Sequence, residues 1–319
     1  MWQIGPAKIE GPFVLAAMLR YTVAPARRLA RSFGAALVST EMMIARGIVK
    51  GAPLYRRKAS FDPCEQPIAA QIAANEPESA VQAAKILADM GFMIVDINMA
   101  CPAFKVTQRL MGGGLLKHCD LALRITEAVS RCAKAVTVKL RLGFSPQEPI
   151  EPGFIGRLAD AGAQAVTIHG RYVSQVFSGR ADWKRIGELA SASPIPVIGS
   201  GDVETAADAL RMLRELPVTA VAFARGAVGK PWVFAEAREL LAGRQPHPPG
   251  CEQLRRIASN YFDEIRRFPW PAYCIAVARR TLPDFLAHLP LNRSMLRELS
   301  KVKTLGDLDL WAVRWGIAA

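Results

Sequence analysis

The sequence has few of the residues that build metal sites and disulfide frameworks. Its 319 residues include four histidines and six cysteines, with no CxxC pair and no spaced Cys/His cluster. This pattern argues against a zinc site. No apolar run reaches the ~18 residues that a membrane helix needs. The apolar stretch at 13–19 is too short for a secretory signal and is followed by no cleavage pattern. We therefore expect a reduced, cytoplasmic protein in which most cysteines are small buried hydrophobes.

Acidic residues are scarce relative to basic ones. The chain has 41 lysines and arginines against 28 aspartates and glutamates, which gives a formal net charge of +13. An excess of this size suggests an anionic partner, and nucleic acid is the first candidate. The alternative is that the basic residues occupy solvated, arginine-rich helix faces.

Short apolar runs alternate with amphipathic segments over the first 240 residues or so. The expected strands are 13–18, 36–42, 68–73, 93–97, 135–140, 165–169, 197–199 and 220–224. Helical patterns between them include 79–90, 121–132, 152–161, 183–190 and 205–216. Eight strands that alternate with helices predict a (β/α)8 TIM barrel. A doubly wound sheet is the alternative, and the lack of a GxGxxG motif after the first strand counts against it.

A stretch rich in proline and glycine divides the chain. Between residues 242 and 250 there are three prolines and two glycines, which cannot continue a helix. We predict a barrel over 1–242, a linker over 243–250 and a small helical domain over 251–319. Its expected helices are 252–267, 273–287 and 291–302.

The predicted helical domain is rich in arginine, and aromatic residues are interleaved with the basic ones. Basic groups can neutralise phosphates, and aromatic rings can stack on unpaired bases. An RNA-binding surface is therefore one interpretation of this domain. Tyr261 and Phe268, by contrast, are expected to belong to the domain's own core.

Asn98 and Cys101 follow directly after the strand expected at 93–97. In a parallel α/β barrel, the carboxyl end of a strand is where catalytic groups lie. A thiol there can act as a general acid if its pKa stays near the free value of about 8.5. The alternative is an inert, buried cysteine. The glycines at 112–114 allow the backbone to approach a ligand closely.

Lys139 and His169 lie near the ends of the next two expected strands. A lysine on the inner face of a barrel strand is costly unless it meets an anion or an electron-rich ring. Together the two side chains could form one wall of a shared site. The alternatives are a lysine that extends into water and a histidine that is only a hydrogen-bonded core residue.

Glycine-containing loops follow the seventh and eighth expected strands, at 199–202 and 224–227. In (β/α)8 barrels these two loops commonly bind a phosphate through backbone N–H groups. Arg225 could add a charge-assisted hydrogen bond. Ordinary strand-to-helix turns also favour glycine, and they remain the alternative for either loop taken alone.

These motifs together resemble the signature of the tRNA-dihydrouridine synthase family. The matching positions are 95–106, Lys139, His169, 178–183, 201–202 and 225–226, in the order and spacing of the family. Members of that family are FMN-dependent barrels with a helical tail. They reduce the C5–C6 double bond of uridine in tRNA and use NADPH to reduce the flavin.

The resemblance implies a role for each matching residue. Cys101 would protonate uracil C5 while reduced FMN delivers hydride to C6, and Asn98 and Arg180 would contact the substrate. The implied cofactor contacts are Ala16, Met18, Gln71, Lys139, His169, Ser200, Gly201, Asp202, Ala224, Arg225 and Gly226. Of these, Gln71, Lys139 and His169 would face the flavin ring and its side chain. The phosphate would lie among Gly201, Asp202, Arg225 and Gly226.

Several positions depart from the family pattern. The chain has alanine at 17 for proline, alanine at 100 and 224 for glycine, serine at 200 for asparagine, and glycine at 113 for alanine or serine. Each change involves only a few atoms. Two other functions stay open: a flavin-dependent reductase of a small molecule, and a non-catalytic RNA-binding relative of the family.

Overall fold

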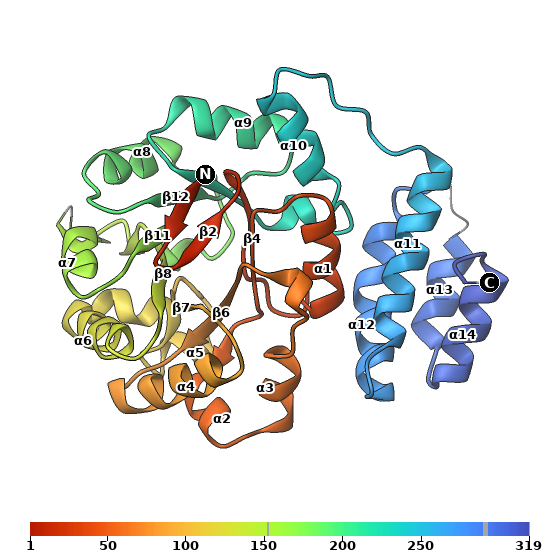
Figure 1. The fold of residues 1–319 in the computed structure, drawn as a ribbon, viewed down its shortest axis with the longest axis horizontal. Coiled ribbons are helices and arrows are strands. Elements are labelled where there is room, and N and C mark those ends of the chain that lie inside the picture. The colour runs from red at the N-terminus through yellow and green to blue at the C-terminus, as the bar shows by residue number, and fades with distance from the viewer. Residues whose placement is uncertain (152, 290–292, 319) are drawn as a thin grey trace.

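The computed structural model describes residues 1–151, 153–289 and 293–318, and its largest part is a closed barrel (Figure 1). Within these ranges the ring consists of β3 (Phe13–Leu15), β4 (Leu37–Ser39), β6 (Ile68–Ala73), β7 (Ile94–Met99), β8 (Ala135–Arg141), β11 (Ala165–His169), β12 (Val197–Ser200) and β13 (Ala220–Phe223). All eight strands run parallel, and β4 pairs with both β3 and β6, so the ring closes. The two-residue strand β5 (Met43–Ile44) adds to β6. The predicted (β/α)8 barrel is confirmed.

Helices surround the barrel (Figure 1). They are α1 (Ala24–Ser32), α2 (Ala45–Val49), α3 (Pro53–Lys58), α4 (Pro77–Asp89), α5 (Phe104–Thr107), α6 (Cys119–Ser130), α7 (Phe154–Asp160), α8 (Trp183–Ser191), α9 (Ala206–Glu215) and α10 (Val233–Leu241). Two of them begin where the sequence offers a capping side chain. Asp182 accepts from the backbone at the start of α8, and Thr205 forms a capping box with Asp208 at the start of α9.

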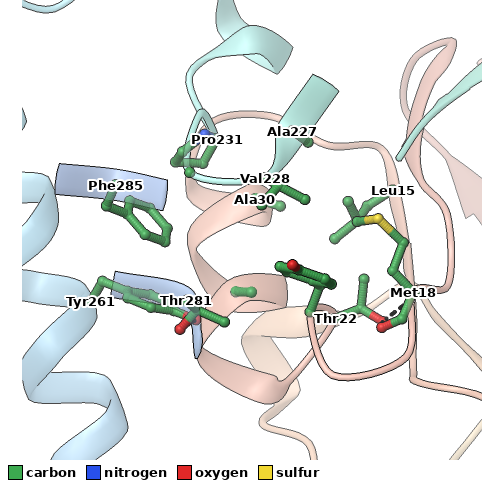
Figure 2. Close-up of a pocket in the computed structure, with 13 residues that line it drawn as sticks. Leu15, Met18, Thr22, Ala30, Ala227, Val228, Pro231, Tyr261, Thr281 and Phe285 are labelled. Carbon is green, nitrogen blue, oxygen red and sulfur yellow. Dashed lines mark hydrogen bonds between the residues drawn. The ribbon is translucent and has the colours of Figure 1, made fainter. Parts of the chain in front are cut away.

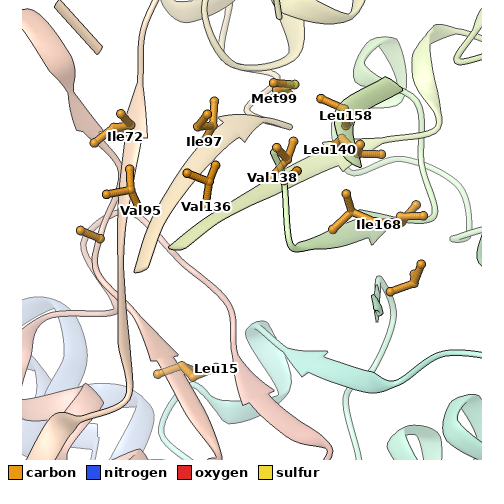
Figure 3. Packing of buried hydrophobic residues seen from close by; sticks show 14 of the residues in the cluster. Leu15, Ile72, Val95, Ile97, Met99, Val136, Val138, Leu140, Leu158 and Ile168 are labelled. Atoms are coloured by element: carbon orange, nitrogen blue, oxygen red, sulfur yellow. The ribbon is translucent and has the colours of Figure 1, made fainter. Parts of the chain in front are cut away.

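The alternation of side chains along the strands separates an apolar layer from a polar interior. On β8, Val136 and Val138 point outward into a buried cluster that includes Leu158 of α7 (Figure 3). Because successive strand residues face opposite sides, Thr137 and Lys139 point into the barrel. Strand β7 alternates in the same way. The barrel interior is therefore available for polar chemistry.

An N-terminal hairpin covers the amino ends of the strands. It consists of β1 (Trp2–Ile4) and β2 (Ala7–Ile9), which pair antiparallel. Its residues Ile4 and Ile9 form a buried cluster with residues at the amino ends of several barrel strands, among them Val14, Ala135 and Ala220. This end of the barrel is thus filled with apolar side chains, and the carboxyl end is left for a site.

Residues 243–250 form no helix or strand in the described structure and lead to four further helices. These are α11 (Cys251–Arg266), α12 (Pro271–Leu286), α13 (Arg293–Lys301) and α14 (Leu305–Arg314). They share a hydrophobic cluster in which the rings of Tyr261 and Phe285 stack with centroids 4.3 Å apart. The Tyr261 hydroxyl donates a hydrogen bond to Thr281 at 2.9 Å. Tyr261 therefore lies in the core as predicted, and Phe268 packs partly buried against it.

The helical domain packs directly on the barrel. Val23 and Trp232 of the barrel belong to the hydrophobic cluster of the four helices. Arg28 of α1 forms an ion pair with Glu264 of α11. The guanidinium of Arg57 lies 5.6 and 5.5 Å from the ring centroids of Trp270 and Tyr273, respectively. Apolar, ionic and cation–π contacts thus all cross this interface.

Some element boundaries differ from the prediction, and some elements were not predicted. The strands expected at 13–18 and 36–42 end at Leu15 and Ser39. The helices expected at 152–161 and 291–302 appear as α7 and α13, while residues 152 and 290–292 lie outside the described residues. The hairpin and helices α1, α2, α3, α10 and α14 were missed. No helix in the described ranges is both long and apolar enough to span a membrane.

Candidate active site

Four buried polar side chains form a connected network inside the barrel, on strands β6, β7 and β8. Asp96 accepts one hydrogen bond from Gln71 Nε2 and one from Thr137 Oγ1, each at 2.7 Å. Asn98 Nδ2 donates to Gln71 Oε1, also at 2.7 Å. Burial raises the pKa of Asp96, while the two hydrogen bonds and the charge of Lys139 oppose the rise. The network links two predicted site residues, Gln71 and Asn98, to two that the sequence analysis did not select.

The turn that carries Cys101 is held from both sides. Asn98 Oδ1 accepts from the backbone N–H groups of Ala100, at 3.1 Å, and of Cys101, at 2.9 Å. The Cys101 carbonyl accepts from the Gly113 N–H at 2.9 Å. A Cβ at Gly112, where φ is +56°, would lie 2.9 Å from Cys101 Cβ. The glycines at 112 and 113 therefore allow close packing under a cysteine that stays partly exposed.

Arg141 joins the Cys101 turn to the loop after β11. Its Nε donates to the Ala100 carbonyl at 2.9 Å, and its Nη1 donates to the Tyr172 carbonyl at 2.8 Å. Burial and the neighbouring charge of Arg171 lower the pKa of Arg141 to about 10. Arg141 is a functional candidate that the sequence analysis missed, although it lies two residues after Lys139 on the same strand face.

Lys139 points into the barrel interior without a partner. None of the described residues forms a hydrogen bond or ion pair with its ammonium group. Burial and the charge of Arg141 lower the pKa of Lys139 to about 8, although the charge of Asp96 acts in the opposite direction. Lys139 is partly buried, and a cation in such a position is stabilised by an electron-rich or anionic group placed beside it.

His169, on the next strand, is neutral at physiological pH. Burial lowers its pKa to about 2, helped by the positive charges of Lys139, Arg141, Arg171 and Arg225. In the described structure its Nδ1 is buried and has no hydrogen-bond partner. His169 can therefore offer a neutral ring with one unused nitrogen to a ligand.

The loops after β12 and β13 line a polar cleft beside His169. Its lining includes Ser200, Gly201, Asp202, Ala224 and Arg225. Gly201 has φ +113°, and a Cβ there would lie 2.8 Å from that of Ala181. A Cβ at Gly226 would lie 2.7 Å from backbone atoms of Glu204. The loop after β13 thus meets the loop after β12 at Gly226, and Arg225 lies over half exposed at their edge, at 57%.

The carboxylate of Asp202 is already engaged by donors of the protein. Arg171 Nη2 donates to both of its oxygens, at 2.7 and 2.8 Å, and the Ala181 N–H donates to one of them. Burial alone would raise the pKa of Asp202, but these hydrogen bonds and the charge of Arg171 hold it below its usual value. Arg171, which the sequence analysis missed, has a second buried nitrogen without a partner among the described residues.

Of the three remaining predicted contacts, Ala16 borders this constellation, while Arg180 and Met18 lie apart from it. Arg180 is exposed on the loop before α8. Ala16 lines the barrel interior, together with Lys139. The side chain of Met18, however, lines a separate cavity between the barrel and the helical domain, close to Thr22 (Figure 2). The structure therefore brings Lys139, His169 and the two loops together but does not add Met18 to them.

Comparisons with known proteins give this geometry a context. A family profile described as Dihydrouridine synthase (Dus) matches residues 14–308. A probable tRNA-dihydrouridine synthase of Rhodobacter capsulatus is 35% identical over 303 residues, covering 93% of this chain and 94% of that protein. One from Rhizobium leguminosarum is 39% identical, covering 87% and 86%. The tRNA-dihydrouridine synthase B of Xanthomonas campestris is 32% identical, covering 95% and 92%.

Solved structures support the fold independently. Histamine dehydrogenase from Rhizobium sp. 4-9 superposes with a TM-score of 0.59 at 16% identity, covering 82% of this chain and 50% of that one. A complex of 2-naphthoyl-CoA reductase gives a TM-score of 0.57 at 9% identity, covering 76% and 52%. At such identities the likeness concerns the barrel alone. The profile match and the relatives at over 30% identity decide the family: the chain belongs to the dihydrouridine synthases.

Proposed function

We propose that the protein reduces specific uridines in tRNA to 5,6-dihydrouridine, with bound FMN as cofactor and NADPH as reductant. The observation that carries this proposal is the partly exposed Cys101, held on a constrained turn beside the barrel mouth in a chain of this family. The names of the relatives support tRNA as the substrate. The excess of basic residues supports a polyanionic partner.

The residues of the barrel mouth suit FMN in their chemistry. Among the described residues, His169 Nδ1 is buried without a partner, and Lys139 is a partly buried cation without one. We assign both to the flavin and its side chain. We assign the phosphate to the cradle formed by Gly201, Gly226 and Arg225, where backbone N–H groups and a guanidinium can meet an anion. When bound, FMN supplies the hydride that reduction of a pyrimidine double bond requires.

Asp202 takes a different role from the one that the resemblance implies. Its carboxylate would repel a phosphate, and it is already engaged by Arg171 and the Ala181 N–H. We propose that Asp202 holds Arg171 and Arg225 in place, with its backbone rather than its side chain facing the cofactor. Ser200 and Ala224 contribute backbone to the same cleft.

Cys101 is proposed as the proton donor to uracil C5. The general acid must carry its proton when the substrate arrives, so the neutral thiol is the active form. Asn98 uses one amide hydrogen and its oxygen within the protein, and its second amide hydrogen is left to donate to a uracil carbonyl. Arg180, exposed on its loop, is assigned to the surrounding nucleotide.

The four-helix domain is proposed to bind tRNA outside the active site. Its exposed basic residues among those described are Arg255, Arg256, Arg267, Arg279, Arg280, Arg297, Lys301, Lys303 and Arg314; the side chain of Arg293 lies outside the described residues. A uridine must leave its stack to enter a concave site, so the enzyme needs a grip on the rest of the molecule. We accordingly assign catalysis to residues 1–242 and tRNA binding to residues 251–319.

The first prediction concerns Cys101. The variant Cys101→Ala should keep the flavin absorption bands of the wild type but lose dihydrouridine formation by roughly a hundredfold or more, the scale of general-acid catalysis. Dihydrouridine in tRNA is measured by mass spectrometry of its nucleosides. Cys251→Ala removes another exposed thiol, on α11, and serves as the matched control.

Different results would support the proton-donor assignment or one of the two alternative functions. Full activity in Cys101→Ala would end the proton-donor assignment. Reduction of free uridine or of a small enone as fast as tRNA would identify a small-molecule reductase. A protein that retains no FMN yet binds tRNA would identify the non-catalytic relative.

A further inference from the structure

The buried network in the barrel is a directed chain of hydrogen bonds. Starting from Thr137, it runs through Asp96 and Gln71 to Asn98, and each of the three links measures 2.7 Å. It ends at the backbone N–H groups of the Cys101 turn, which Asn98 Oδ1 accepts. The four side chains are at most 6% exposed, so water cannot replace a missing partner.

The direction of the chain follows from the chemistry of its members. Both oxygens of Asp96 accept, as a carboxylate requires. Gln71 must therefore present Nε2 to Asp96, which leaves Oε1 for the next residue. Asn98 must in turn present Nδ2 to Gln71, which turns Oδ1 toward the Cys101 turn. One acceptor thus sets the orientation of two amides and of the turn beyond them.

We propose that Asp96 is a positioning residue for uridine reduction: it fixes the polarity of the Gln71 and Asn98 amides and, through Asn98, the placement of the Cys101 turn. This inference rests on the proposed function. The chain also leaves Asn98 with one unused amide hydrogen. This hydrogen can serve only an acceptor, such as a carbonyl oxygen of uracil, and not the amino group of cytosine.

Asp96→Asn tests the proposal because asparagine has nearly the shape of aspartate but replaces one of its two hydrogen-bond acceptors with a donor. An asparagine at 96 can donate to Gln71 Oε1, which competes with Asn98 for that oxygen. We expect kcat to fall roughly tenfold to a hundredfold, the effect of a misplaced catalytic group, with KM for tRNA nearly unchanged because the binding surface is untouched. The flavin spectrum should be retained.

A paired variant provides the rescue. In Asp96→Asn combined with Gln71→Glu, the asparagine amide can donate to one glutamate oxygen, and Asn98 Nδ2 can donate to the other. The direction toward Cys101 is then restored, and kcat should recover most of the loss. Because every buried group again has a partner, the paired variant keeps the test available if Asp96→Asn alone does not fold.

The reactivity of the Cys101 thiol reports on the placement of its turn without depending on catalytic turnover. The rate at which iodoacetamide alkylates Cys101, measured by peptide mass spectrometry, should change in Asp96→Asn and return in the paired variant. Thr126→Val removes a buried hydrogen-bonding hydroxyl on α6, outside the barrel, and should leave that rate unchanged.

Three results decide between the possible outcomes. Wild-type kcat and alkylation rate in Asp96→Asn would overturn the proposal. Equal losses in the single and paired variants would overturn it as well, because polarity would then not be the cause. If the wild type reduces no uridine but the alkylation rates follow the expected pattern, the positioning role stands and the proposed function fails.

Discussion

At the scale of single residues, the active site contains positive charges that the protein itself does not fully pair. Lys139 has no partner among the described residues, and one nitrogen of Arg171 is buried without one. Burial, together with the neighbouring cations, lowers the pKa of His169 to about 2. Such an arrangement is costly without a ligand, and the anionic cofactor proposed above would relieve that cost.

The lowered pKa of Lys139, about 8 against an ordinary 10.5, gives a prediction with a definite sign. Between these two values the unfolded chain binds the proton that the folded protein has lost, so stability rises with pH. In flavin-free protein, Lys139→Met should therefore be more stable than the wild type at pH 7, by roughly 1–3 kcal/mol. The gap should narrow as pH increases from about 8 toward 10.5.

Urea unfolding at a series of pH values measures this gap. Lys134→Met, which removes a different lysine just before β8, is the control and should show no such trend. A gap for Lys139→Met that stays constant across the window would contradict the account of a destabilised buried cation.

The residues at strand ends were predictable, and their partners were not. Asn98, Cys101, Lys139 and His169 could be selected because strand periodicity and position mark them. Asp202 was selected as a phosphate contact, but its ion pair with Arg171, 31 residues earlier, was not predicted. No sequence pattern shows that these two side chains meet, or that Met18 faces another cavity.

At the scale of elements, the loops after β12 and β13 are built for close approach. Gly226 lies against the backbone of Glu204, so an added Cβ cannot be accommodated by rotating a side chain. The loops must move apart, and the proposed phosphate cradle changes shape. The glycine is therefore required by contact between two backbones, whereas its φ is ordinary.

We predict that Gly226→Ala weakens FMN binding by roughly tenfold or more, the cost of a modest steric clash. Gly156→Ala on α7 is the matched control, because nothing lies within 4 Å of the added Cβ. Fluorescence titration of flavin-free protein with FMN gives both affinities. Equal affinities in the two variants would mean that the phosphate binds elsewhere.

Sequence periodicity predicted the long, regular elements and missed the short ones. The eight strands and helices α4, α6, α7, α8 and α9 were found because their apolar patterns are continuous. Helices α2 and α3 are only five and six residues long and lack a clear period. Helix α14 was missed although Thr304 and Asp307 form a capping box at its start, a signal that could have found it.

At the scale of the whole molecule, specific contacts hold the helical domain against the barrel. Arg57 of α3 reaches the rings of Trp270 and Tyr273 across this interface. The sequence predicted both parts but not their contact, because the contacting residues lie more than 200 positions apart. How a bound tRNA meets Cys101 depends on this relative placement.

Arg57→Ala should loosen the helical domain, lowering stability by roughly 1–2 kcal/mol and reducing kcat/KM for tRNA more than the affinity for FMN. Arg211→Ala removes another cation–π contact, with Trp183, that stays within the barrel, and it serves as the control. Hydrogen exchange of the segment 268–274 follows the loosening. Unchanged exchange and unchanged kcat/KM in Arg57→Ala would show that this contact does not set the domain placement.

The most direct test of the central claim is the dihydrouridine content of tRNA that initially lacks this modification, measured by mass spectrometry after incubation with FMN-loaded protein and NADPH. The account predicts a gain of two hydrogen atoms at defined uridines, dependent on both FMN and Cys101. Flavin-loaded, tRNA-binding protein that leaves every uridine unreduced would contradict it.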